Sequence, residues 1–266
     1  VSKTILKIVL VLVLLLVIVV ATMPFWISPA ARKAVEAGGT SAMGVKTTLA
    51  ELDIGVFSGT CDLGGLNIAN PEGFETPHFM NLGSGAVALD IQSLRKDVIE
   101  IPKFELTGLD LNLEKGSGQA NYEKILENLS KLSTEEEKPK EEEPGKRFVI
   151  KEIVIKDVKV TAKMAGLTVP MKIDEMRLQN VGSEGEGVDL KKLIALIVSG
   201  VLKGVAEEGT GVLPEGISSS LNDGLNSLKG LGGHGEAAAK LIEDAGVDAT
   251  KALDKAGDKL KGLTGK

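Results

Sequence analysis

The chain has 266 residues, of which 43% are hydrophobic and only 3% aromatic, and its formal net charge is −6. This charge disfavours nonspecific nucleic-acid binding, which needs clustered lysine and arginine to displace the counterions of phosphates. A single cysteine, Cys61, excludes an intramolecular disulfide framework. The two histidines, His78 and His234, lie far apart without metal-ligand spacing. We therefore expect neither a metal site nor a cofactor.

The N-terminus carries one long apolar segment, Ile5 to Trp26, interrupted by only a lysine, a threonine and a proline. At about 1.5 Å per residue a helix of this length reaches roughly 33 Å, enough to cross a hydrocarbon core of about 30 Å. We predict a single transmembrane anchor over residues 1–26, with an aromatic residue at the interface. Residues of the predicted anchor include Ile8, Leu12, Leu16, Val20 and Trp26.

A cleaved secretory signal peptide is the alternative, because Lys3 and Lys7 form a basic start and residues 28–30 offer a small-residue cleavage site. The apolar run is long for that role. Charge does not orient the segment, since Arg32 and Lys33 on its far side balance the two N-terminal lysines. The short N-terminal tail favours an orientation that places the rest of the chain outside the cytoplasm.

After a predicted stalk, residues 27–44, apolar residues recur at every second position. This alternation is typical of strands with one apolar and one wet face, and it predicts about five antiparallel strands over residues 45–114. The pair Ser58-Gly59 indicates a hairpin turn, and Gly64-Gly65 a bulge. A helix capped by Asn121 is predicted to complete the first block, residues 45–132.

An acidic stretch, residues 133–147, contains no apolar residue and is predicted to be a flexible linker. Strand periodicity then resumes and predicts three strands, with a turn at Ala165-Gly166. Asp189 is expected to cap an amphipathic helix that closes this second block, residues 148–208. Residues 209–266 form a Gly/Ser-rich and then Ala/Lys/Asp-rich tail, for which we expect peripheral helices.

The alternating apolar residues are candidates either for a closed core or for a surface that faces lipid. A sheet with an apolar face needs a cover, which amphipathic helices or a lipid can supply. The residues expected on this face are Leu52, Ile54, Val56, Val87, Leu89, Ile91, Leu109, Leu111, Leu113, Ile153 and Ile155.

Catalytic motifs are missing from the sequence: it has no phosphate-binding Gly-rich loop, no nucleophile elbow and no helical zinc motif. Asp90 and Asp110 are the one carboxylate pair that we considered for acid–base chemistry. Solvated strand faces explain both residues, so we expect no enzymatic activity.

A turn motif follows one predicted strand, Leu66-Asn67-Ile68-Ala69-Asn70-Pro71-Glu72-Gly73-Phe74. Pro71 restrains Asn70 to extended geometry, and Gly73 frees the backbone before Phe74. Together with other features in the same order along the chain, this motif makes residues 1–205 resemble the AsmA-like family of bacterial envelope proteins. The other features are the anchor, Gly44-Val45, Ser93-Leu94, Ile99-Glu100-Ile101, the Asn121 helix and the run from Met176 to Gly182. The late embryogenesis abundant type 2 domain also carries an Asn-Pro after a strand, but the acidic linker would interrupt such a compact domain.

The resemblance implies a membrane-anchored α+β protein with a curved, mostly antiparallel sheet in two blocks and peripheral C-terminal helices. It also implies an inner-membrane protein whose bulk is periplasmic, and a role in lipid handling or envelope maintenance, with acyl chains on an apolar β-groove. The expected partners are the membrane, phospholipid, and a second envelope protein or another copy of the chain. The alternative is an assembly protein that docks a partner through its sheet edges or C-terminal helices.

Overall fold

The structure is a computed structural model, and it describes residues 27–55, 58–88, 92–93, 96–134, 145–183 and 187–228. The predicted membrane anchor, with Ile8, Leu12, Leu16, Val20 and Trp26, lies outside these residues, as do most of the acidic linker and residues 229–266. Among the described residues, none of the helices has the length and hydropathy that a membrane crossing requires.

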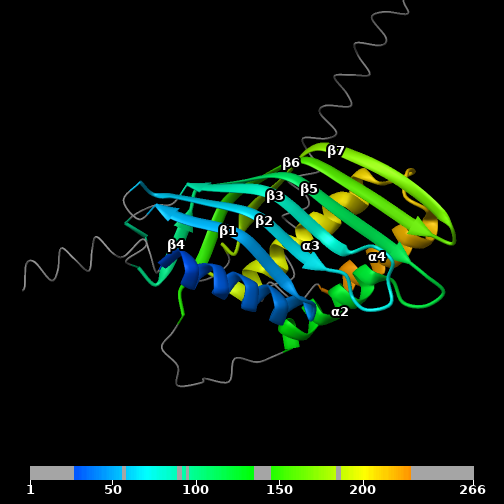
Figure 1. Cartoon of the computed structure of the whole chain (residues 1–266), viewed down its shortest axis with the longest axis horizontal. Coiled ribbons are helices and arrows are strands. Elements are labelled where there is room, and N and C mark those ends of the chain that lie inside the picture. The colour runs from blue at the N-terminus through cyan, green and yellow to red at the C-terminus, as the bar shows by residue number, and fades with distance from the viewer. Residues whose placement is uncertain are drawn as a thin grey trace, which may run out of the picture.

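Seven strands form one open, curved sheet in the part of the chain described (Figure 1). Five lie in the first predicted block: β1 (Thr47–Gly55), β2 (Thr60–Ala69), β3 (His78–Ala88), β4 (Val98–Ile101) and β5 (Lys103–Lys115). The second block contributes two long strands, β6 (Arg147–Met164) and β7 (Leu167–Val181), where the sequence predicted three. The pairs β1–β2, β2–β3, β3–β5 and β6–β7 are antiparallel, whereas β4 and β5 each pair parallel with β6.

The two predicted blocks are joined in the same sheet. Both β4 and β5 pair parallel with β6, and the same offset of 49 residues holds from Val98↔Arg147 to Lys115↔Met164. This constant offset means that β4 and β5 act as one long strand, interrupted at Pro102, along one side of β6. The connection from β5 to β6 contains a helix, as parallel strands require. The prediction of two separate blocks missed this pairing.

A line of residues with unusual backbone geometry crosses the sheet at a single register position. The pairing is interrupted on six strands at one shared position, which is Ala50 on β1, Gly65 on β2, Gly83 on β3, Gly108 on β5, Asp157 on β6 and Asp174 on β7. Three of them, Gly65, Gly108 and Asp157, have positive φ angles of 62°, 76° and 54°. We call this line the crease. Glycine and aspartate tolerate this conformation better than other residues, and glycine bends of this kind produce sheet curvature.

The crease also corrects the phase of the side-chain alternation. A shift of one residue along a strand would move its apolar side chains to the opposite face of the sheet. Leu52 and Leu49 are three residues apart on β1, yet both take part in apolar cross-strand rows, with Leu63 and Leu66 respectively as their β2 partners. Because the strands change phase together, pairing continues on both sides of the crease.

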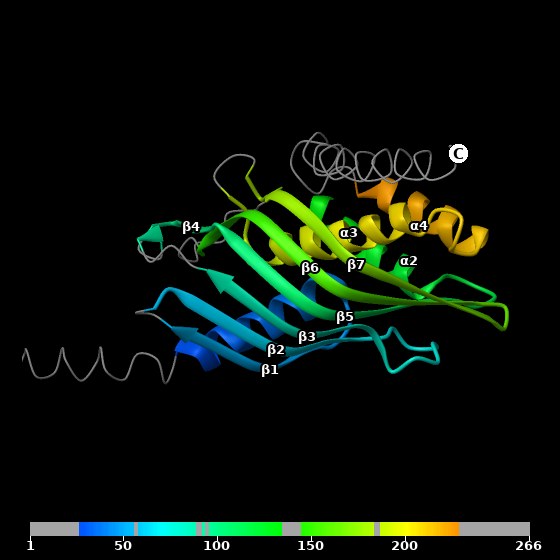
Figure 2. The same cartoon turned by 90° about the horizontal axis from the view of Figure 1, so that it is seen from above.

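Three helices cover the concave face (Figure 2): α2 (Asn121–Thr134), α3 (Leu190–Glu208) and α4 (Glu215–Ser227). Their main contacts with the sheet are on β5, β6 and β7. α3 begins at the predicted cap, where the Asp189 side chain accepts a hydrogen bond from the Lys192 amide. Leu193, Val201 and Val205, from its predicted apolar stripe, are buried. α4 lies within residues 209–266, for which the sequence predicted peripheral helices.

Residues 27–43, predicted as part of a stalk, are helical and pack along β1. Side chains of this N-terminal helix accept hydrogen bonds from three amides of the strand: Ser28 from Ile54, Glu36 from Leu49, and Thr40 from Thr47. Sheet edges expose unpaired amides that invite association with other strands. The N-terminal helix therefore caps the β1 edge of the sheet.

Candidate functional site

The apolar residues of the concave face form rows that run across the strands. On the β1–β2 hairpin side of the crease, one row is Ile54, Cys61, Val87, Phe104, Ile153 and Leu178, and the next is Leu52, Leu63, Gly85, Leu106, Ile155 and Met176. On the other side, the nearest row is Leu49, Leu66, Leu82, Leu109, Val158 and Ile173. These rows are the surface that the sequence predicted as a groove or a core.

Most of this surface is closed core. Leu109, Leu111, Leu113, Ile153 and Ile155 are at most 2% exposed, because α2, α3 and α4 pack over their part of the sheet. Val87 is also buried. The helices thus supply the cover that an apolar sheet needs. Of the remaining predicted residues, Val56, Leu89 and Ile91 lie outside the described residues.

One part of the concave face is only partly covered. Leu52 and Ile54 on β1, Cys61 and Leu63 on β2, and Phe104 on β5 are partly buried and lie in the two rows next to the hairpin. We call these five residues the apolar corner. The main sheet contacts of α2, α3 and α4 fall on β5 to β7, away from the first two strands. An apolar chain that lay on the corner would remove this surface from water, which is favourable.

The apolar corner lies at the end of the molecule where the N-terminal helix begins. Both views place the β1–β2 hairpin and β4 at this end (Figures 1 and 2). The N-terminal helix reaches α3 further along, since a side chain at Gly38 would lie 3.4 Å from Ile194 and 3.6 Å from Leu190. The predicted membrane anchor directly precedes this helix in sequence. The corner lies next to the first turn of the described part of this helix, since the Ile54 amide donates a hydrogen bond to the Ser28 hydroxyl.

Cys61 is the one thiol of the chain and a member of the apolar corner. Burial, together with the neighbouring carboxylates of Asp62 and Asp53, raises the pKa of the thiol to about 11. Asp53 and Asp62 are direct cross-strand partners on the opposite, exposed face. At neutral pH the thiol is thus protonated and acts as a small apolar side chain.

The Asn-Pro turn motif lies at the opposite end of the molecule, between β2 and β3. The Asn70 side-chain amide donates two hydrogen bonds to Thr76, one to its backbone oxygen at 3.0 Å and one to its hydroxyl at 2.7 Å. The Lys124 ammonium lies 4.9 Å from the centre of the Phe74 ring and donates to the Glu72 carbonyl. Pro71 is buried, and Gly73 has a φ of 94°. The motif forms a closed, internally bonded turn.

Glu114, at the end of β5, fixes this turn to the sheet. Its carboxylate accepts hydrogen bonds from the amides of Glu75 and Thr76 at 2.7 Å and 3.1 Å, and from the Thr76 hydroxyl at 2.9 Å. Burial opposes ionisation of Glu114, but these hydrogen bonds outweigh it, so the pKa lies below the usual value for a glutamate. Asn121, fully buried, donates to Asn70 and accepts from the Glu114 amide.

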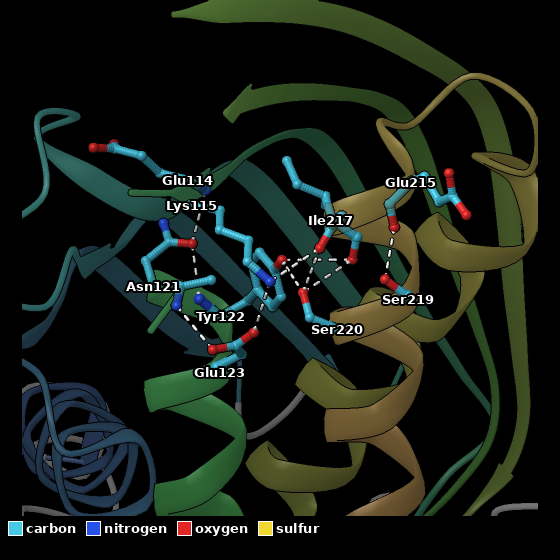
Figure 3. Close-up of polar contacts among 11 residues, drawn as sticks. Glu114, Lys115, Asn121, Tyr122, Glu123, Glu215, Ile217, Ser219 and Ser220 are labelled. Atoms are coloured by element: carbon cyan, nitrogen blue, oxygen red, sulfur yellow. Dashed lines mark hydrogen bonds and ion pairs between the residues drawn. The ribbon is translucent and has the colours of Figure 1, made fainter. Parts of the chain in front are cut away.

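The same end is bonded to α4 (Figure 3). The Tyr122 hydroxyl lies 2.6 Å from the Ser220 hydroxyl, and the Lys115 ammonium contacts both Glu123 and the Gly216 carbonyl. All these polar groups bond to other parts of the chain. The arrangement explains the turn motif as a structural element that joins β2, β5, α2 and α4, rather than as a binding site.

Sequence reasoning found two members of the apolar corner, Leu52 and Ile54, and missed Cys61, Leu63 and Phe104 as parts of the candidate surface. The cross-strand register, which a single sequence does not reveal, brings them together. Asp110, considered for acid–base chemistry, lies on the convex face with a carboxylate oxygen 3.9 Å from His78 Nε2. Its suggested partner, Asp90, lies outside the described residues.

The model of the AsmA family matches residues 1–169, which include the predicted anchor, the N-terminal helix and β1 to β6. No curated protein matches the chain. The match covers well over half of the 266 residues. Helices α3 and α4, which cover much of the concave face, lie beyond the matched range. The chain belongs to the AsmA family, and this membership indicates an envelope-associated function.

Proposed function

We propose that the chain is a non-enzymatic, membrane-anchored envelope protein that shelters an acyl chain of a phospholipid on its apolar corner. The supporting observation is the uneven cover of the concave face. Five residues close to the start of the N-terminal helix are partly exposed, whereas the rows further along the sheet are packed under helices. Because most apolar residues on the rest of the face are buried, the proposed contact is limited to the corner.

The proposed location follows from the family and from the apolar N-terminal segment. A single-pass anchor in the inner membrane would place the β-domain in the periplasm and the corner next to the bilayer. In this arrangement an acyl chain reaches the corner without crossing water. The proposed role is lipid handling or envelope maintenance close to the membrane.

Cys61 provides a direct test, because it lies in the corner and is the one cysteine of the chain. The full chain in detergent is alkylated with a maleimide at fixed pH while a short-chain phospholipid is added. We expect the phospholipid to slow alkylation of Cys61. As a control, a Cys61→Ala, Gly118→Cys variant carries its thiol at the opposite end, where a side chain meets no atom within 4 Å. Alkylation of Cys61 that is independent of phospholipid, or equal slowing in both proteins, would exclude the proposal.

The alternative, an assembly role through sheet edges, has support at one edge. The N-terminal helix caps β1, but in the described part of the chain β7 pairs with β6 alone. Pro170 contributes no amide to this edge, which limits pairing near the β6–β7 turn. A partner strand would therefore add along residues 172–179. Crosslinking to a partner that is lost on Lys172→Pro substitution, with Cys61 insensitive to phospholipid, would favour this second role.

A further inference from the structure

Basic residues gather at one side of the end that carries the apolar corner. Lys96 precedes β4 and Lys146 precedes β6. Arg147 is the first residue of β6, and Lys151 follows on the same strand. We call these four residues the basic cluster. They are held together, because the Lys146 ammonium donates to the Lys96 carbonyl at 2.6 Å and the Arg147 amide donates to the Asp97 carbonyl at 2.9 Å.

The cluster carries a local excess of positive charge on a chain whose net charge is −6. Lys96 and Lys146 are exposed, and the Lys151 side chain is 62% exposed. Among the described residues, the carboxylates nearest the cluster in sequence are Asp97, Glu100 and Glu152. Glu100 lies 3.8 Å from the Lys151 ammonium, and Glu152 forms an ion pair with Arg177. Lys191 adds a further exposed positive charge in the first turn of α3, next to the bridge between Phe148 and Val188.

The convex face of β1 and β2 at this end carries negative charge. Glu51, Asp53 and Asp62 are exposed on the convex face of β1 and β2, and the cross-strand pair of aspartates has no basic partner in the register. A negatively charged surface would thus attract the β4–β6 side and repel the β1–β2 convex side. The two effects favour one orientation of the domain.

We propose that the basic cluster binds the anionic headgroups of a phospholipid bilayer and so turns the apolar corner toward the membrane. The inference rests on the proposed function in that the chain is taken to be held at a membrane by its N-terminus. Anionic lipid surfaces attract basic residues that lie close to a membrane segment, and each contributes about fivefold to the binding constant. In Figures 1 and 2, β4 and the start of the N-terminal helix lie at the same end.

The test measures how close the cluster lies to the headgroups when the full chain is reconstituted in lipid nanodiscs. A fluorophore is attached at Gly145→Cys in a Cys61→Ala background, because a side chain at Gly145 meets no atom within 4 Å and neighbours Lys146. Nitroxide-labelled headgroups quench the fluorophore on contact. A second label, at Gly118→Cys, reports on the opposite end.

We expect strong quenching at Gly145→Cys in nanodiscs of phosphatidylcholine with phosphatidylglycerol, and weak quenching in phosphatidylcholine alone. The label at Gly118→Cys is expected to stay unquenched in both. Raising the salt from about 0.1 M to about 1 M shortens the screening length from about 10 Å to about 3 Å and is expected to abolish the difference. Quenching at Gly145→Cys that does not depend on lipid charge or on salt would overturn the proposal, even in a protein that shelters acyl chains.

Charge reversal separates the cluster from the overall charge of the protein. The double substitution Lys96→Glu, Lys146→Glu is expected to weaken the headgroup contact by more than about fivefold for each lysine, because each change removes a positive charge and adds a negative one. The matched control is Lys159→Glu, Lys172→Glu, which changes the net charge equally on directly paired, exposed positions of β6 and β7. We expect the control to behave as the unsubstituted chain. Equal loss in both pairs would contradict a specific role for the cluster.

Discussion

The crease predicts a graded response to glycine substitution. At Gly108, φ is 76° and an added Cβ would lie 3.8 Å from the nearest atom, the Gly83 Cα, so alanine introduces backbone strain without a clash. At Gly65, φ is 62° and the added Cβ would lie 2.8 Å from the Ala50 Cβ. Alanine at this position therefore combines strain with overpacking against the neighbouring strand.

These geometries give different magnitudes. A left-handed backbone costs a residue with a Cβ about 1–2 kcal/mol, which is the expected loss for Gly108→Ala. Overpacking adds about 1–3 kcal/mol, so Gly65→Ala should cost about 2–5 kcal/mol. The control is Gly118→Ala, where φ is not positive and a side chain meets no atom within 4 Å. It should be neutral or stabilise by up to about 1 kcal/mol, because alanine restricts the unfolded chain.

Thermal unfolding of the full chain in one detergent, followed by circular dichroism, measures the differences at about 2–4 °C for each kcal/mol. Adding Ala50→Gly to Gly65→Ala should relieve the overpacking but leave the strain, so the double variant should approach Gly108→Ala. Equal melting temperatures for Gly108→Ala and Gly118→Ala would contradict the predicted backbone strain. A melting temperature of Gly65→Ala that does not rise when Ala50→Gly is added would contradict the predicted overpacking.

Three further predictions concern ionisable groups. The pKa of Glu114 is lowered in the folded state, so its contribution to stability is present above the ordinary value of 4.5 and is lost as the pH falls through the folded-state value. Glu114→Gln should lower the free energy of unfolding by about 1.5–3 kcal/mol at neutral pH. Denaturant titrations at several pH values should also show a smaller loss of stability in acid for this variant. The pKa of Cys61 is raised from 9.0 to about 11, so its alkylation rate in the folded chain should keep rising through pH 9 and level off near 11, whereas a plateau near 9 would show an exposed thiol. Glu36 accepts a hydrogen bond from the Leu49 amide at 2.9 Å, so Glu36→Ala should speed hydrogen exchange at Leu49. Exchange at Leu66, which is paired on both sides within the sheet, should not change. Equal exchange at Leu49 in the variant and the unsubstituted chain would contradict capping of this edge.

Local patterns predicted much of the fold. Alternating apolar residues located the strands of the first block, and the caps at Asn121 and Asp189 marked the starts of α2 and α3. The parallel pairing of β5 with β6 could not be predicted, because no local pattern states which distant strand is a neighbour. Among the described residues the second block has two strands where three were predicted, because the β6–β7 hairpin extends over residues 147–181 with the positive φ of Asp157 within it.

The candidate site was harder to predict than the fold. Alternation identifies apolar faces but does not separate a covered residue such as Leu111 from a partly exposed one such as Ile54. That distinction depends on where α2, α3 and α4 pack. The N-terminal helix escaped prediction because its alanines and glycines give a weak apolar stripe, although Ala42 and Met43 are buried. The turn motif was located from sequence, but its bonds to Glu114 and Asn121 needed the tertiary structure.

The proposed function requires that an acyl chain reach the apolar corner from the bilayer. The most direct measurement reconstitutes the full chain in nanodiscs with a phospholipid that carries a photoreactive diazirine in its acyl chain, and maps the adducts by mass spectrometry. We predict adducts on Leu52, Ile54 and Leu63 in addition to those on the apolar N-terminal segment, and none on Leu167, which is 54% exposed at the opposite end. Adducts confined to residues 1–26, with the corner unlabelled, would contradict the account.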